Sequence, residues 1–125
     1  MVQLFNPDTI ATQVLMDVKN IDIDILKDVD IIQAFLNKVI EELKLNIVGE
    51  CSKEFKHGIT KIYLLSNNTA SSHLTLHTFT DQGKMTIDLF TCCYDNHIIG
   101  LKNLIKQFFD VSVLSIDAYH FTRGS

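Results

Sequence analysis

The sequence predicts an α+β fold, a two-layer α/β sandwich in which a mostly antiparallel sheet carries two helices on one face. Two observations predict it. Two segments repeat apolar residues at intervals of three and four, as amphipathic helices do. The other patterned segments alternate apolar and polar residues or are rich in β-branched residues, and turn sequences separate them. Their order along the chain is strand, helix, four strands, helix and strand.

Residues 10–19 mix β-branched and polar side chains and predict the first strand. The first helix follows, and Asp28 or Asp30 is placed to cap it, because a carboxylate accepts hydrogen bonds from the free N–H groups of a first turn. The spacing of its apolar residues predicts one buried face. These residues are Ile31, Ile32, Phe35, Leu36, Val39, Ile40 and Leu43.

Two further strands are predicted at residues 46–54 and 59–65, with a turn near His57 and Gly58. A polar loop at residues 66–70 then leads into a β-hairpin.

The hairpin is expected to turn at residues 81–84, which read Asp-Gln-Gly-Lys. Side chains alternate between the two faces of a strand. Leu74 and Leu76 therefore belong with Ile87 and Leu89 on the side that the helices cover.

The opposite face of the hairpin is polar and partly aromatic, which is typical of a solvated surface or of a dimer interface that contains a site. A register that pairs apolar with apolar residues sets His73 opposite Cys92 and His77 opposite Asp88. The side chains on this face are His73, Thr75, His77, Phe79, Thr86, Asp88, Phe90 and Cys92.

A second amphipathic helix is predicted at residues 96–109, with Asp95 as its cap, and a last strand at 111–118. The inward positions of this helix are Ile98, Leu101, Leu104, Ile105 and Phe108.

The composition limits the possible functions. A chain of 125 residues with 46% hydrophobic and 21% charged residues is typical of a single globular domain. The net charge of −4 and the absence of a Lys/Arg-rich run argue against a nucleic-acid partner. The sequence has no apolar run of the ~20 residues that a membrane span needs, and no signal-peptide pattern. Three cysteines (Cys51, Cys92 and Cys93) do not make a disulfide framework, so a cytoplasmic location is expected.

The chemistry-bearing residues of the hairpin permit several interpretations. Two histidines on a strand face are more often structural than catalytic. His73, His77 and Cys92 are possible zinc ligands, but no fourth ligand is evident, so no metal is predicted. A hydrolase triad of Ser72, His77 and Asp88 is rejected, because Ser72 alternates to the face opposite His77.

The hairpin resembles the core of the prokaryotic-type S-adenosylmethionine decarboxylase proenzymes. That core reads Glu-Ser-His-x-x-x-His-Thr-Trp-Pro-Glu and, on a second strand, Asp-x-Phe-Thr-Cys-Gly. Here residues 71–81 and 88–93 match it without a gap from serine to histidine or from serine to cysteine. Weaker similarity covers nearly the whole chain and includes Phe55, residues 58–60 and residues 123–124.

The resemblance implies self-cleavage. The hydroxyl of Ser72 attacks the carbonyl of Ser71, and loss of the Ser72 α-proton then releases the upstream chain. The products are a β chain, residues 1–71, and an α chain, residues 72–125, that begins with a pyruvoyl group derived from Ser72. By the same resemblance His77 assists processing, and Thr60 matches a hydroxyl residue that helps.

The resemblance also implies an activity, the decarboxylation of S-adenosylmethionine for spermidine and other polyamine synthesis. The pyruvoyl cofactor forms a Schiff base with the substrate amine and accepts the electrons of decarboxylation. Cys92 matches the thiol that returns a proton to the α-carbon, Phe55 an aromatic that stacks on adenine, and Asp81 a carboxylate that contacts the ribose. Family members are dimers with sites at the subunit interface, so a homodimer is expected.

The chain departs from the family pattern at four places. Ser71 replaces glutamate, about four residues lengthen the loop at 67–70, residues 79–81 read Phe-Thr-Asp in place of Trp-Pro-Glu, and Cys93 replaces glycine. These changes keep two alternatives open. One is a pyruvoyl decarboxylase of ornithine or arginine, and the other is a homologue that binds a ligand without processing itself.

Overall fold

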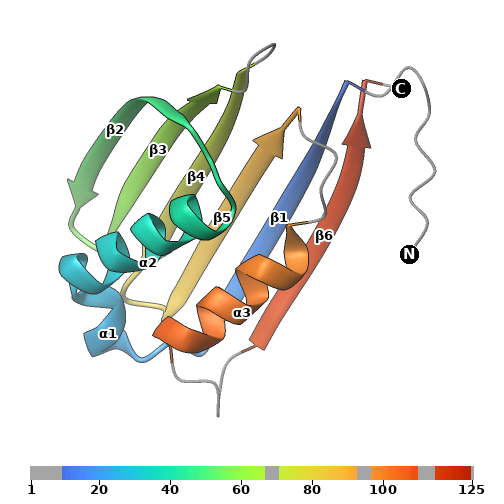
Figure 1. The fold of residues 1–125 in the computed structure, drawn as a ribbon. Helices are drawn as coiled ribbons and strands as arrows, with labels where there is room; N and C mark the ends of the chain where they lie inside the picture. Colours follow the sequence, from blue (N-terminus) through green and yellow to red (C-terminus); the bar gives the residue numbers. More distant parts are fainter. Residues whose placement is uncertain (1–9, 67–70, 93–96, 110–114, 125) are drawn as a thin grey trace.

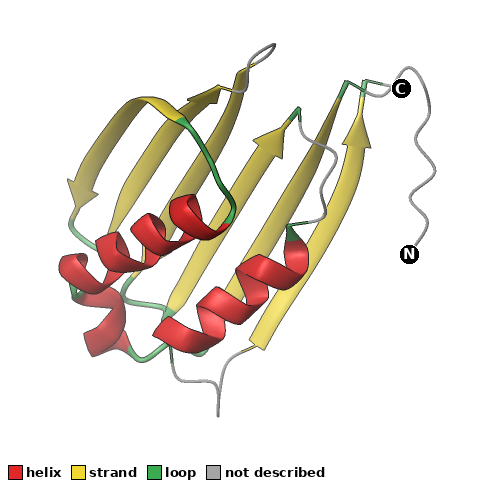
Figure 2. Ribbon diagram, in the orientation of Figure 1, coloured by secondary structure: helices red, strands yellow, loops and turns green. Residues whose placement is uncertain are grey.

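The computed structural model describes residues 10–66, 71–92, 97–109 and 115–124. Within this part of the chain, six strands form one antiparallel sheet and three helices lie against one of its faces (Figures 1 and 2). The predicted α+β sandwich is therefore confirmed, with one helix more than expected. In chain order the elements are β1 (Ala11–Lys19), α1 (Ile23–Lys27), α2 (Val29–Glu42), β2 (Ile47–Phe55), β3 (Gly58–Ser66), β4 (Ser71–Phe79), β5 (Lys84–Thr91), α3 (Ile98–Phe108) and β6 (Ser115–Arg123).

The strands are arranged in the order β2-β3-β4-β5-β1-β6. β1, the first strand of the chain, therefore lies between β5 and β6, and both of these come from the last third of the sequence (Figure 1). β6 covers Ser115–Arg123, so the strand predicted at 111–118 ends five residues further on than expected. The remainder of that prediction, residues 111–114, lies outside the described residues.

Aspartates cap the first two helices. Asp28, one of the two predicted candidates, accepts hydrogen bonds from the N–H groups of Asp30 (3.0 Å) and Ile31 (3.2 Å) at the start of α2. Asp22 caps the unpredicted helix α1 in the same way. This helix has only five residues, too few for an apolar period of 3.6 to be recognised in the sequence.

The N-cap position of α3 is His97. The helix therefore starts later than predicted, and Asp95, its expected cap, lies outside the described residues.

The core lies between the helices and the sheet. Phe35 of α2 is fully buried and makes edge contacts with Phe108 and Phe109, at ring distances of 5.7 and 5.4 Å. From the sheet, Leu74 and Leu76 of β4 are also fully buried, as their alternation predicted. The phenolic oxygen of Tyr63 stays satisfied inside this layer because it accepts a hydrogen bond from Gln33 (3.1 Å).

The register of the β4–β5 hairpin differs from the prediction by two residues. His73 lies opposite Phe90, where Cys92 was expected, and His77 lies opposite Thr86, where Asp88 was expected. The turn occupies residues 80–83, one residue earlier than predicted, and moving a turn by one residue shifts every cross-strand pair by two. A shift of two keeps each side chain on its face, so the predicted faces are correct.

The face of the sheet opposite the helices, called the open face below, is not covered by any described residue (Figure 2). Strand alternation places several exposed apolar side chains on it, in two groups. Ile62 and Leu64 lie on β3, and Tyr119 and Phe121 lie on β6.

Candidate active site

The residues of the predicted cleavage point lie at the start of β4, next to Cys92, which directly follows β5. The backbone N–H of Cys92 donates a hydrogen bond to the Ser72 hydroxyl oxygen (3.2 Å). The thiol of Cys92 donates to the carbonyl oxygen of Ser71 (3.3 Å). One residue thus holds both the attacking atom and the carbonyl group that self-cleavage would join.

Ser72 is buried, with 6% of its surface exposed, and its side chain lies on the helix-covered side of the sheet. Ser71, one position earlier, is exposed. The peptide bond between them therefore sits at the boundary between the core and the open face. The lengthened loop before it, residues 67–70, lies outside the described residues.

A second pair of predicted residues meets on the open face, toward the end of β4. Thr60 of β3 and His77 of β4 are directly opposite each other. The Thr60 hydroxyl and the His77 Nδ1 are 2.9 Å apart, within hydrogen-bond distance. The hydroxyl fixes the orientation of the imidazole ring and leaves Nε2 for another partner.

Ser72 and His77 do not meet within one chain. They are five residues apart on the same strand, which corresponds to roughly 16 Å at ~3.3 Å per residue, and their side chains lie on opposite faces. A single chain therefore cannot bring the His77 ring to the peptide bond that it is expected to help break.

The far end of β4 forms the wall of a pocket of about 190 Å³ on the open-face side. Phe55 and Phe79 contribute exposed aromatic rings, 62% and 40% exposed. Thr60 and His77 line the same pocket, so it adjoins the threonine–histidine pair. Phe79 was not among the site residues predicted from the sequence; it lies at the end of β4, opposite Lys84, and lines this pocket.

Three contacts hold the β2–β3 turn against the end of β4. The Thr80 N–H donates to the His57 carbonyl (2.9 Å), and the Ile59 N–H donates to the Thr78 hydroxyl (3.0 Å). Gly58 packs so closely on the Thr78 backbone that a Cβ atom there would clash with its carbonyl oxygen. Phe55, just before the turn, is therefore fixed relative to β4.

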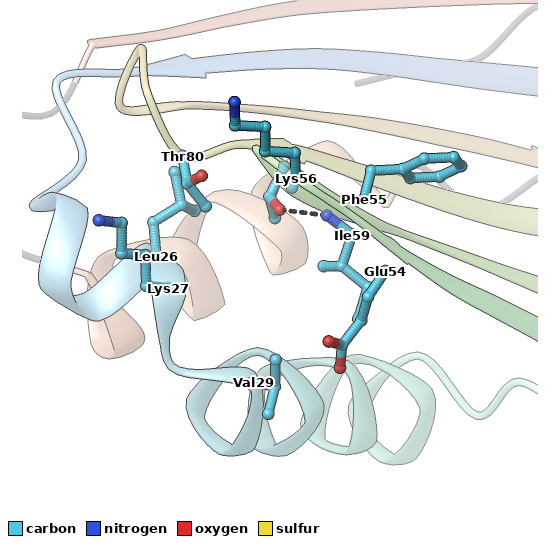
Figure 3. A pocket seen from close by; sticks show the side chains of 10 residues that line it. Leu26, Lys27, Val29, Glu54, Phe55, Lys56, Ile59 and Thr80 are labelled. Carbon is cyan, nitrogen blue, oxygen red and sulfur yellow. Dashed lines mark hydrogen bonds between the residues drawn. The ribbon is translucent and has the colours of Figure 1, made fainter.

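A second pocket of about 190 Å³ lies on the helix side of the same turn, and Phe55 borders both pockets. Figure 3 shows the Phe55 ring directed away from Leu26 and Val29 of the helix layer. The ring is thus available to a ligand on the open face. Asp81, the expected ribose contact, lies in the exposed turn after β4.

The described residues include no group of three or more His, Cys, Asp or Glu side chains placed to hold a metal ion. Nor does any described helix have the length and apolarity needed to cross a bilayer.

The family profile described as S-adenosylmethionine decarboxylase matches residues 12–123. The chain belongs to this family. The resemblance read from the hairpin is thereby confirmed for nearly the whole chain. Members of the S-adenosylmethionine decarboxylase family are pyruvoyl-dependent enzymes, and the comparisons support neither of the two alternatives that the sequence left open.

Curated relatives show how divergent this member is. The S-adenosylmethionine decarboxylase proenzyme of Archaeoglobus fulgidus is 25% identical over 84 residues, which cover 66% of this chain and 71% of the relative. That of Thermodesulfovibrio yellowstonii is 31% identical over 84 residues, covering 66% and 59%. The crystal structure of the adenosylmethionine decarboxylase from Aquifex aeolicus has a TM-score of 0.77 and 24% identity, covers 94% of this chain and 93% of that one, and shows the same fold.

Proposed function

We propose that this chain cleaves itself between Ser71 and Ser72 and that the mature homodimer decarboxylates S-adenosylmethionine with the pyruvoyl group so formed. The observation that carries the proposal is the double contact of Cys92, through its N–H with Ser72 Oγ and through its thiol with the Ser71 carbonyl. Membership of the family supports the activity.

Self-cleavage starts with addition of the Ser72 oxygen to the carbonyl carbon of residue 71. The carbonyl oxygen gains negative charge at this point, and the Cys92 thiol that donates to it offsets that charge. The C–N bond between residues 71 and 72 then breaks, and the new bond between the Ser71 carbonyl carbon and the Ser72 oxygen remains. The nitrogen of residue 72 takes up the proton of the Ser72 hydroxyl. The peptide bond has become an ester.

The ester is broken by removal of the Ser72 α-proton. Elimination expels residues 1–71 as a carboxylate and leaves dehydroalanine at position 72, which water converts to a pyruvoyl group and ammonia. This step needs a base, and the Nε2 atom of His77 serves when Nδ1–H donates to the Thr60 hydroxyl oxygen, because the neutral imidazole then has no proton on Nε2.

His77 reaches that proton only from a second copy of the chain. The open face offers the surface for it, since Ile62, Leu64, Tyr119 and Phe121 are between 37% and 56% exposed there. Suppose that two copies pack with their open faces together and their β4 strands antiparallel. A two-fold axis that runs between the two sheets at the level of Thr75, perpendicular to β4, then brings His77 of one copy level with Ser72 of the other. This separation of the two residues supports the proposal of a homodimer.

The same arrangement completes the substrate site. Ser72 and Phe79 are seven residues apart along β4, roughly 23 Å at ~3.3 Å per residue, so one chain cannot place its reacting end against its aromatic pocket. In the reversed dimer the pocket of one copy faces the cleavage point of the other. Phe55 then stacks on the adenine ring and Asp81 accepts hydrogen bonds from the ribose hydroxyls.

The pyruvoyl ketone supplies the electron sink for decarboxylation. Formation of the pyruvoyl group breaks the bond between residues 71 and 72. The Ser71 carbonyl, to which the Cys92 thiol donates in the precursor, is then no longer bonded to residue 72. That thiol is then available to return a proton to the α-carbon of the product. Cys51 and Cys92 are free thiols, which favours the cytoplasm as the compartment.

The first test is the intact mass of the purified protein under denaturing conditions. Two chains, residues 1–71 and residues 72–125 with a pyruvoyl N-terminus, are expected. Release of labelled carbon dioxide from carboxyl-labelled S-adenosylmethionine, with ornithine and arginine as comparison substrates, tests the activity. An uncut chain, or release from ornithine or arginine alone, would contradict the proposal.

The second test uses mixed dimers of two variants that differ in mass. Ser72→Ala cannot be cut but has an intact His77, and His77→Ala has an intact Ser72. The His77→Ala chain is expected to remain whole alone and to be cut when coexpressed with Ser72→Ala. Cutting of His77→Ala alone, or no cutting in an isolated mixed dimer, would exclude the action of His77 between subunits.

A further inference from the structure

Five side chains on the open face form a closed ring of contacts. His73 Nε2 lies 3.7 Å from a carboxylate oxygen of Asp88, and the other oxygen of Asp88 accepts a hydrogen bond from Gln13 (2.9 Å). The side-chain amide oxygen of Gln13 accepts a hydrogen bond from the Arg123 guanidinium, which lies 5.9 Å above the centre of the Phe90 ring. Phe90 closes the ring by stacking on His73, with ring centres 5.3 Å apart and planes within 4°.

The ring joins four neighbouring strands, β4, β5, β1 and β6, at the end of the sheet where cleavage occurs. His73 directly follows Ser72, and Phe90 precedes Cys92 by two residues. The ring thus fixes β4 next to Ser72 and β5 close to Cys92, and these are the two residues whose hydrogen bond forms at the cleavage point.

We propose that this ring positions Cys92 against the bond between Ser71 and Ser72, and that Arg123 and Gln13 are positioning residues for self-cleavage. The inference rests on the proposed function, since it concerns the same bond. Neither residue touches the reacting atoms. Each acts through Asp88, Phe90 and His73.

The geometry at the cleavage point is sensitive to such support. The hydrogen bond from the Cys92 N–H to the Ser72 oxygen measures 3.2 Å, at the long end of the range for N–H···O, so a small strand displacement breaks it. A misplacement of ~1 Å in a reacting pair costs up to ~100-fold in rate. The individual ring contacts are half exposed and weak when taken alone. A closed ring restrains all four strands together.

Arg123 is well held at its end of the ring. Its backbone carbonyl accepts a hydrogen bond from the N–H of Ile10 (2.9 Å). Gly124, at φ +79°, packs so tightly on Ile10 that a Cβ atom there would clash with its side chain. The guanidinium has a planar fork that can donate to Gln13 and lie over Phe90 together, which a lysine ammonium cannot do.

The ring also spans the two product chains. Gln13 belongs to residues 1–71, and the other four members belong to residues 72–125. Gln13 is therefore the one member that ties the ring to the β chain, through its contacts with Asp88 and Arg123.

The experiment measures the cleavage half-life of freshly translated precursor for Arg123→Gln, Gln13→Leu and the double variant. Each single variant is expected to slow cleavage by roughly 10-fold or more. The double variant is expected to be no slower than the slower single variant, because both changes open the same ring. Arg123→Lys should restore little of the rate.

Asp117→Asn is the matched control. It breaks the Lys19–Asp117 ion pair (3.6 Å), which joins β1 and β6 at the opposite end of the same strands. Its cleavage half-life should equal that of the wild type, although it loses a contact of similar exposure between the same two strands.

The outcomes separate this inference from the proposed function. A wild-type chain that stays whole would overturn both. A wild type that cleaves while Arg123→Gln and Gln13→Leu cleave equally fast would overturn the ring alone. The ring would also be overturned if the slowing of cleavage in the double variant equalled the product of the two single effects and the melting temperature fell in parallel, because that pattern indicates general destabilisation.

Discussion

The two faces of strand β4 have opposite tasks although they come from alternate residues of one segment. Leu74 and Leu76 are fully buried under the helices, whereas His73 and His77 are half exposed on the open face. The covered face provides stability through apolar burial. The open face carries the ring and the threonine–histidine pair, to which we assign positioning and proton transfer in the proposed self-cleavage. Ser72 is the exception, because the reacting hydroxyl belongs to the covered face.

In the proposed mechanism the bond between Ser71 and Ser72 reacts at the boundary of the two faces, and the apolar core stays intact beneath it. The Ser72 side chain is held inside, while the carbonyl group that it attacks is contacted by the thiol of Cys92 from outside. Variants on the covered face should therefore change the free energy of unfolding, and variants on the open face should change the rate of cleavage or of turnover.

The largest effect is expected for Ser72→Ala. Removing the hydroxyl removes the nucleophile and the source of the cofactor, so both cleavage and decarboxylation should be abolished. Intact mass and labelled carbon dioxide release measure the two. Ser71→Ala is the matched control, since residue 71 contributes its carbonyl and that variant should still be cut. Activity in Ser72→Ala would contradict the pyruvoyl mechanism.

Cys92→Ala should separate the two roles of the thiol. Turnover is expected to fall by about 10²–10⁴-fold through loss of the proton donor. Cleavage should be slowed by a smaller factor, roughly 10-fold, and still reach completion, because the backbone N–H that holds Ser72 is unchanged. Precursor half-life and turnover of the fully cleaved protein give the two numbers. Normal turnover would show that another group donates the proton.

Leu76→Ala and Thr75→Ala compare adjacent positions on the two faces. The leucine is fully buried, so its truncation should lower the free energy of unfolding by about 2–5 kcal/mol. The threonine is half exposed and its truncation should cost less than about 1 kcal/mol. Urea unfolding of the uncleaved Ser72→Ala background gives both values. Equal losses would mean that the open face also contributes to the core of the isolated chain.

The smallest effect is expected for Asp28→Ala in the helix layer. Loss of the cap of α2 should lower the free energy of unfolding by about 1 kcal/mol. The cleavage half-life should not change, because the cap lies near Thr78 at the end of β4, whereas Ser71 and Ser72 are at its start. Asp30→Ala, which removes the carboxylate that is not the cap, is the control for charge. A slower cleavage in Asp28→Ala would show that the helix layer takes part in positioning the bond.

The hairpin shows what a local pattern can and cannot predict. Alternation correctly assigned Leu74 and Leu76 to the covered face, because a slip of one residue would expose them. It did not determine the register, since a slip of two preserves both faces. That choice depended on the turn, which ends at Gly83 with φ +62° and whose carbonyl accepts a hydrogen bond from Ile21. Ile21 is far away in sequence and gave no local signal.

The sequence alone determined the strand and helix types, the buried faces and the family, because these depend on residue periods of two or 3.6 and on a short motif. Only the tertiary structure decided the strand order that brings Gln13 and Arg123 beside Phe90, and the pairing of β3 with β4 that places Thr60 opposite His77. The physical reason is the distance along the chain over which each kind of interaction acts. Periodicity acts between neighbours in the chain, whereas sheet order depends on contacts between segments about a hundred residues apart.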